Sequence, residues 1–232
     1  MKVTKHGENS YKLTRFGLMN CYIVDEGDSL TLVDANLPNS ADNILKVAAD
    51  IGKPITKIVI THGHMDHVGS VDGIAEKLPN VELYVSARTA AYMQGDFTLP
   101  ASDTGSVKTN NFPPVNLQPT KTVSEGDQIG SLTVIESPGH CRDHISWFDR
   151  RDGTLYCGDS WQSAGGVAVM GDTRWLFPLP SLVTWDKQVS LQSAAHTLTF
   201  NPTRLCPGHG KVVENAFPIM QAAYQRAAKR LG

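Results

Sequence analysis

Short apolar runs of strand length open the chain, and the first two flank a polar turn. Residues 21–24 and 30–33 are apolar, and the turn between them at 25–28 contains a glycine and acidic side chains. That arrangement predicts a β-hairpin. Residues 40–51 then carry apolar side chains at helical spacing, beginning at a serine suited to an N-cap and followed by a glycine. The alternation continues with a predicted strand over 55–60, a helix over 68–78, a strand over 81–85 and a helix over 87–94.

Two irregular stretches interrupt the second half of the chain. Residues 95–121 are rich in proline, glycine, threonine and asparagine, and residues 160–182 are unusually aromatic for a loop. Loops of this length in a compact domain are functional or disordered, and for the first we favour a lid or pocket wall. The remaining predicted elements are strands over 128–136, 145–149, 154–157 and 203–206, with 145–157 forming a hairpin, and helices over 185–197 and 217–231. Alternating strands and helices predict an α/β fold with helices against sheets.

Size, charge and cysteine usage narrow the class of protein. The chain has 232 residues and a formal net charge of −2, without an internal repeat or linker, so we expect a single domain over 1–232. Nothing in this charge favours a nucleic-acid or membrane partner, and a small-molecule substrate is expected. No apolar stretch reaches signal-peptide or membrane-span length, which predicts a soluble, cytoplasmic protein of unspecified oligomeric state. The four cysteines lack C-x-x-C spacing, which predicts buried thiols, although Cys141 and Cys206 stand close to histidines and a ligand role stays open.

The segment 61–67, Thr-His-Gly-His-Met-Asp-His, is the strongest candidate for chemistry. It lies between a predicted strand and a predicted helix. His62 and His64, two apart on extended backbone, point to the same side and form one half of a metal site. Asp66 and His67 then face a neighbouring point, so this loop alone is able to serve two ions. The alternative is a polar turn with surface histidines, but the spacing favours metal ligands.

Three further short motifs follow predicted strands. They centre on His140, Asp159 and His209, each flanked by glycine or proline. Glycine and proline fix turns and allow close backbone approach. Each motif alone is a weak signal, since such turns are common, but together with the segment 61–67 they form a strong one.

This ordered set of histidines and aspartates resembles the metallo-β-lactamase-fold hydrolase superfamily. The resemblance covers nearly the whole chain and implies an αββα sandwich of four layers, with a metal site at one edge of the two sheets. It also implies that Asp34 orients the ligand loop. The implied ligands are His62, His64 and His140 for one ion, Asp66, His67 and His209 for a second, and Asp159 as a bridge between both.

The implied chemistry is hydrolysis by two divalent metal ions, zinc or else iron or manganese. Such ions lower the pKa of a shared water and supply a bridging hydroxide near neutral pH. Asp66 or Asp159 would act catalytically by relaying a proton to the leaving group. His144 either supports the site or is a structural histidine.

Two other functions stay open at this stage. An oxidoreductase acting on a thiol or persulfide would use one iron held by His62, His140 and Asp159. A non-catalytic binding or scaffold protein is the other alternative, but a scaffold has no need for a complete ligand set.

For a hydrolase, departures from known members narrow the substrate to a lactone, ester or thioester. Glutathione thioesterases carry a helical domain after the last metal histidine, whereas one short helix follows His209 here. Many lactonases of this fold carry a tyrosine three residues after the bridging aspartate, but this chain has Gln162, unless Tyr22 or Tyr92 substitutes. Aromatic loop residues predict a partly apolar pocket, with self-packing of the loops as the alternative; they are Phe97, Phe112, Trp161, Trp175 and Phe177.

Overall fold

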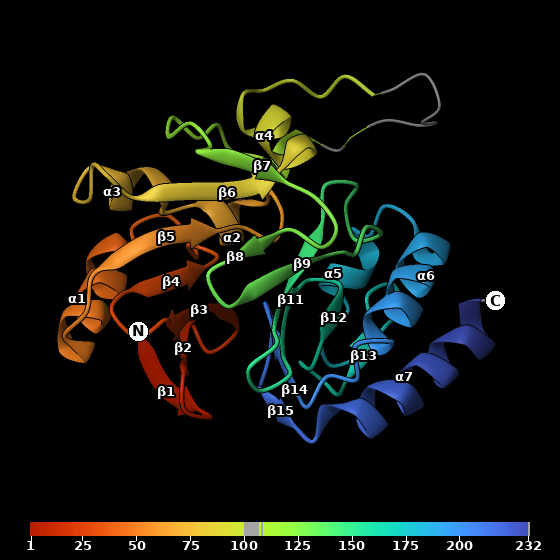
Figure 1. The fold of residues 1–232 in the computed structure, drawn as a ribbon. Helices are drawn as coiled ribbons and strands as arrows, with labels where there is room; N and C mark the ends of the chain where they lie inside the picture. Colours follow the sequence, from red (N-terminus) through yellow and green to blue (C-terminus); the bar gives the residue numbers. More distant parts are fainter. Residues whose placement is uncertain (100–106, 108, 232) are drawn as a thin grey trace.

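The computed structural model describes residues 1–99, 107 and 109–231, in which two β-sheets lie face to face (Figure 1). Within these ranges, the seven strands of the first sheet are adjacent in chain order: β1 (Lys2–His6), β2 (Ser10–Arg15), β3 (Met19–Asp25), β4 (Leu30–Val33), β5 (Ile55–Val59), β6 (Glu82–Ser86) and β7 (Lys121–Val123). The second sheet of the described chain holds six strands, in the spatial order β15 (Val213–Glu214), β14 (Arg204–Pro207), β11 (Thr154–Gly158), β10 (Ile145–Asp149), β9 (Leu132–Glu136) and β8 (Gln128–Ile129). A separate ribbon pairs β12 (Trp161–Gln162) with β13 (Ala168–Val169).

Helices cover the outer faces of both sheets, as Figure 1 shows. Ile44 packs in one apolar cluster with the first sheet, Val59 and Trp147 meet in a second cluster between the sheets, and Met220 packs with Leu155 in a third. These clusters separate four layers, so the predicted αββα sandwich is confirmed. The helices are α1 (Ala41–Ile51), α2 (Met65–Val68), α3 (Val71–Ala75), α4 (Ala87–Met93), α5 (Leu179–Leu182), α6 (Lys187–Leu198) and α7 (Ala216–Leu231), with a 3₁₀ turn η1 (Thr109–Asn111).

Both predicted hairpins are confirmed. β3 pairs antiparallel with β4, and β10 pairs antiparallel with β11. The glycine stop of α1 is also confirmed, because Gly52 has φ 83° and its backbone N–H closes the last turn on Ala48 and Ala49. Ser40 precedes α1 without capping it; its hydroxyl accepts a hydrogen bond from Arg15 at 2.9 Å instead.

Three predicted elements have different bounds in the structure. The helix predicted over 68–78 is two short helices, α2 and α3, and the chain bends between them where Gly69 packs against Pro38 so closely that a Cβ would lie 2.4 Å from the proline ring. The strand predicted over 128–136 is two strands joined by a turn at Gly130, whose φ is +58°. The helix predicted over 185–197 begins at Lys187, because the Asp186 side chain accepts hydrogen bonds from backbone N–H groups of the first turn.

The irregular stretches contain more structure than their composition predicts. Residues 160–182 include the β12–β13 ribbon and all of α5. Of residues 95–121, the part 100–106 and residue 108 lie outside the described residues, so the prediction of a lid there stays a prediction. In the described chain, no helix is long and apolar enough to cross a membrane.

Candidate metal centre

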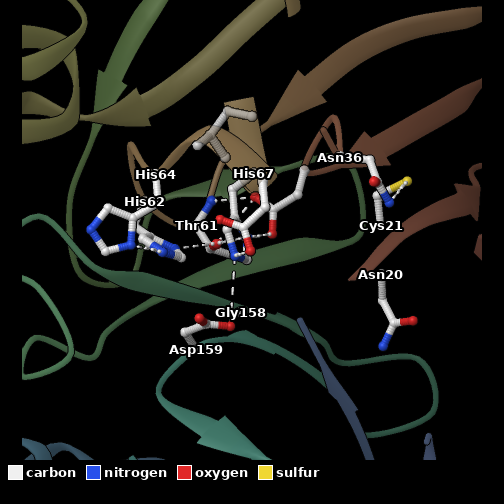
Figure 2. A network of polar contacts seen from close by, with 12 residues as sticks. Asn20, Cys21, Asn36, Thr61, His62, His64, His67, Gly158 and Asp159 are labelled. Carbon is white, nitrogen blue, oxygen red and sulfur yellow. Dashed lines mark hydrogen bonds and ion pairs between the residues drawn. The ribbon is translucent and has the colours of Figure 1, made fainter. Parts of the chain in front are cut away.

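The candidate ligands meet at one edge of the sandwich because they all follow the carboxyl ends of strands. β9, β11 and β14 run in the same direction, since β10 is antiparallel to its two neighbours and β14 is parallel to β11. His140, Asp159 and His209 follow these three strands, and the segment 61–67 follows β5 of the other sheet. In Figure 2 a dashed line joins His67, from that segment, to Asp159, which follows β11 of the other sheet.

The first predicted ligand group is a cluster of buried imidazoles. His62 Nε2 lies 3.0 Å from His64 Nδ1, which lies 3.1 Å from His140 Nε2. All three rings are buried. The structure therefore brings together the three residues predicted for the first ion.

The second predicted group lies beside the first, and Asp159 contacts both. Asp66, His67 and His209 place one ligand atom each within 4.8 Å of one another. Asp159 lies 3.5 Å from His140 Nε2 on one side, and 3.6 and 3.1 Å from the Nε2 atoms of His67 and His209 on the other. Its carboxylate is thus shared by the two groups, as the bridging role requires.

These residues fit divalent cations. Ligands bound at about 2.0–2.2 Å in tetrahedral geometry lie about 3.3–3.6 Å apart, and the cross-group distances of 3.1–3.6 Å fall close to that range. His67 Nε2 and Asp159 Oδ1 are buried polar atoms without a hydrogen-bond partner in the described structure. A backbone cradle accommodates them, because a Cβ on Gly208 would lie 2.5 Å from Asp159 Oδ1 and 2.8 Å from His67 Cε1. The imidazole and carboxylate donors suit zinc, iron or manganese.

Asp34 fixes the tautomers of two ligands. Its carboxylate accepts a hydrogen bond from His67 Nδ1 at 2.8 Å and from the Thr61 hydroxyl at 2.9 Å. Because that hydroxyl donates to Asp34, it accepts from His62 Nδ1, 3.1 Å away. The Nε2 lone pairs of His62 and His67 are therefore both left toward the site. The predicted orienting role of Asp34 has this basis in the structure.

Asp34→Asn is expected to weaken metal binding by roughly 10–100-fold, the range typical of losing such an outer partner. Asparagine tolerates the positive φ of this position, +60°, but its amide nitrogen replaces one acceptor where only donors arrive. Competition with a chromophoric chelator measures the affinity. Wild-type affinity in a folded variant would contradict the orienting role.

His144 holds the backbone of Asp159 in place through a hydrogen bond. The backbone N–H of Asp159 donates to His144 Nε2 at 3.0 Å, so the proton of this imidazole is on Nδ1, which donates to the Ser137 hydroxyl at 2.9 Å. The hydroxyls of Ser137, Ser146 and Ser160 continue this chain, which ends on a backbone carbonyl. Burial lowers the pKa of His144 well below its ordinary value, consistent with a neutral ring. These contacts favour a supporting role for His144 over a purely structural one.

Residues far away in the sequence hold the His209 loop. Asn20 Nδ2 donates to Pro207 O and to Gly210 O, both at 2.9 Å, and the Tyr22 hydroxyl donates to Pro207 O at 2.7 Å. Tyr22 is buried. It therefore positions the ligand loop and does not replace the missing phenol at Gln162. Sequence patterns do not identify Asn20, because a polar residue in a strand gives no sign of its partner.

The two halves of the centre carry different charge before an ion binds. Burial, followed by the charge of neighbouring His67, lowers the pKa of His62 well below its usual value, and burial lowers the pKa of His140 to about 3. Burial also lowers the pKa of His64. These rings are neutral at physiological pH, and neutral imidazole is the form that binds metals.

In the second ligand group, made of Asp66, His67 and His209, the side chains are mainly in their charged forms. Burial opposes the charged forms there, but Asp34 and Asp66 together raise the pKa of His67 to about 9, and Asp159 raises the pKa of His209. Burial is likewise outweighed at Asp66, where His67 and His209 lower the pKa to about 2. Protons on these two histidines balance the carboxylates in the metal-free protein, and cations would displace them.

The cysteines and aromatic residues fall into different environments. Cys21, Cys157 and Cys206 are buried in the apolar clusters, as predicted for structural thiols, whereas the sulfur of Cys141 lies within 4.8 Å of ligand nitrogens of His62 and His64.

Gln162 is completely buried. Of the predicted pocket aromatics, Phe112 and Phe177 contact the site, Phe97 stacks on Tyr92 behind Phe112, Trp161 is fully buried and Trp175 is 92 % exposed. The pocket prediction was therefore wrong for Trp161, whose indole N–H donates to Thr197.

Two cavities adjoin the ligands. A cleft of about 370 Å³, here called the metal cleft, is lined by His64, Asp66, His140, Asp159, Phe177 and His209, together with Leu18. A pocket of about 220 Å³, the aromatic pocket, lies on the His64 side and is lined by His64, Tyr92, Phe112, His140, Arg142 and Trp185. Asn111 lines the metal cleft and Phe112 lines the aromatic pocket, so this part of the irregular stretch 95–121 contributes to the walls of both cavities.

Comparison with known proteins decides the family. A model of the metallo-beta-lactamase superfamily matches residues 14–209, which include every candidate ligand. The chain belongs to the metallo-beta-lactamase superfamily. The match confirms the resemblance drawn from the ligand motifs.

Relatives of this superfamily cover most of the chain. An uncharacterized protein of Bacillus subtilis (strain 168), YobT, is 36% identical over 99% of this chain and 100% of its own length. A hydroxyacylglutathione hydrolase of Methylobacterium nodulans is 29% identical over 76% of this chain, but the match spans only 56% of that relative. The crystal structure of DIM-1 metallo-beta-lactamase has a TM-score of 0.72 at 17% identity, covering 99% of this chain and 97% of that one. The protein is a metal-dependent hydrolase of the metallo-beta-lactamase superfamily, as predicted.

Proposed function

We propose that this protein hydrolyses a lactone, ester or thioester with two divalent ions held by seven side chains. The observation that carries the proposal is the position of Asp159 between two complete ligand groups. The proposed groups are His62, His64 and His140 for the first ion and Asp66, His67 and His209 for the second, with zinc as the expected metal and the whole chain as one domain. When bound, such ions polarise a carbonyl and lower the pKa of a water molecule.

Residues around the proposed ligands orient them for this chemistry. Asp34 and His144 hold the ligands from outside. The Asp66 side chain is 19% exposed, against 4% for Asp159, and it faces the metal cleft. Of the two carboxylates, Asp66 is the better placed to pass a proton to a departing group, because a group that donates a proton to the substrate has to contact it.

The cavities support a small, partly apolar substrate. Phe112 and Trp185 line the aromatic pocket next to His64 and His140, and the guanidinium of Arg142 lies 4.1 Å from the Trp185 ring. Aromatic walls favour an apolar acyl or ring portion, while a few polar groups orient it. The glutathione thioester of the Methylobacterium relative is a less favoured substrate, since that match omits a large part of the relative.

The alternative of a mononuclear-iron oxidoreductase has less support. Such an enzyme would need only His62, His140 and Asp159. It leaves unexplained why Asp66 and His209 approach to 3.3 Å beside His67. A second complete ligand group favours two ions.

The test is a substrate panel with defined metal content. Protein loaded with zinc, iron or manganese is assayed on esters, lactones and thioesters, and in parallel for oxygen uptake with thiols and persulfides. We expect hydrolysis without oxygen uptake, and His64→Ala is expected to lower kcat/KM by more than about 10²-fold, because a direct ligand matters more than the outer partners that typically cost 10–100-fold. His196→Ala, which removes an exposed histidine paired with Glu125, is the matched control. Oxygen uptake alone, or full hydrolysis by His64→Ala, would contradict the proposal.

A further inference from the structure

A second, larger groove runs beside the metal cleft along the β1–β2 ribbon. Its volume is about 600 Å³, and we call it the ribbon groove. Lys2, Lys12 and Lys211 line it, and no acidic side chain does in the described part of the chain. A concave surface with charges of one sign concentrates oppositely charged ligands.

The strand register places this charge on one face. Thr4 pairs with Lys12, and Lys2 pairs with Thr14, so all four side chains point to the same side of the ribbon. Leu13, on the opposite face, is completely buried in the core. Two lysines and two threonine hydroxyls thus form the floor of the groove, while Lys211 comes from the loop after His209.

The charges of Lys2 and Lys211 both act on the ammonium group of Lys12. Lys12 is half-buried, and its Nζ donates to the Gly210 carbonyl at 3.4 Å. Burial lowers the pKa of Lys12, and the charges of Lys2 and Lys211 lower it further. An anion in the groove would relieve this repulsion, and lysine is a common phosphate-binding residue.

The ribbon groove adjoins the metal cleft. Leu18 and Phe177 line both cavities. The Phe177 ring lies 5.5 Å from that of His209, and Lys211 follows His209 by two residues. An extended molecule whose reacting bond lies at Asp159 would pass Leu18 and Phe177 to reach the lysines.

We propose that the ribbon groove binds a phosphate-type dianion carried by one arm of the substrate, opposite to the arm in the aromatic pocket. This inference rests on the proposed function, because it assigns a substrate class to the same centre. The substrate is then an ester or thioester with one apolar end and one phosphorylated end.

The experiment compares matched thioesters in the metal-loaded enzyme. One set carries a terminal phosphate on the acyl arm or on the thiol arm, with arms of increasing length, and the other set carries a hydroxyl there. We expect the phosphate to raise kcat/KM by about tenfold or more in at least one series, as charge-assisted hydrogen bonds allow. Lys12→Gln/Lys211→Gln should remove that preference, so that the phosphate and hydroxyl sets are hydrolysed with similar kcat/KM. Lys46→Gln/Lys77→Gln removes the same charge from other exposed lysines and should retain the preference.

Calorimetry with an alkyl phosphate tests binding independently of turnover. Weaker binding to Lys12→Gln/Lys211→Gln than to the wild type and to Lys46→Gln/Lys77→Gln supports the groove even if no ester is hydrolysed, in which case only the proposed function fails. Equal binding to all three proteins, or hydrolysis that ignores the phosphate in every series, overturns the inference and leaves the hydrolase intact.

Discussion

Asp159→Asn is expected to reduce kcat/KM by well over the roughly 10–100-fold that loss of an outer partner costs. Among the described side chains, this carboxylate lies within 3.6 Å of ligand nitrogens in both groups, at His140 on one side and at His67 and His209 on the other. Asparagine keeps the shape but removes the charge and one of two oxygen donors. Steady-state kinetics on the best ester or thioester, with elemental analysis of the same samples, should show lost turnover and fewer than two bound ions.

Asp172→Asn is the matched control for that variant. Asp172 is also a buried aspartate, but it pairs with Arg226 and Arg230, which lie on α7. Its loss should lower the melting temperature, because breaking a buried ion pair leaves uncompensated charge, while kcat/KM stays near the wild-type value. If Asp159→Asn keeps two ions and full turnover, Asp159 is not the bridge.

Part of the candidate ligand cluster was predictable because its signal is local. His62, His64 and His67 fall within one loop after a strand, and their spacing alone indicates a metal. His140 and His209 needed the family resemblance, since a glycine–histidine pair after a strand is also an ordinary turn. Alternating strands and helices predicted an α/β fold, because they depend on residue spacing and not on distant contacts, whereas the four-layer αββα arrangement came from the family resemblance.

Apart from Asp34 and His144, the residues that support the site were not predictable from the sequence, because each depends on a long-range contact. Asn20 and Tyr22 reach the Pro207 loop across some 190 positions of chain. Asp143 accepts a hydrogen bond from the backbone N–H of Gly63 at 2.7 Å, and nothing in its motif indicates that partner. The aromatic loops illustrate the same limit, since hydrophobicity does not tell Trp161, which is buried, from Trp175, which is exposed.

Removal of the ions by a chelator is expected to abolish hydrolysis and to lower the melting temperature by about 5–10 °C. Saturating ligand at 100 times its dissociation constant contributes about 2.7 kcal/mol, and 1 kcal/mol shifts the melting temperature of a domain of this size by about 2–4 °C. Differential scanning calorimetry of loaded and stripped protein measures the difference. His209→Ala, with one ligand fewer, should show a smaller shift between the two states.

The difference in melting temperature between loaded and stripped protein should widen as pH rises from about 6.5 to 9. In the metal-free protein the pKa of His67 is raised from 6.5 to about 9 by Asp34 and Asp66, which outweigh burial. A raised pKa contributes stability that is complete below the unfolded value and is lost as pH rises through the folded value. In the loaded protein Nε2 of this ring carries no proton to lose, so the stripped protein weakens more across this range. A melting difference that narrows with pH would mean that His67 does not exchange a proton for a metal ion.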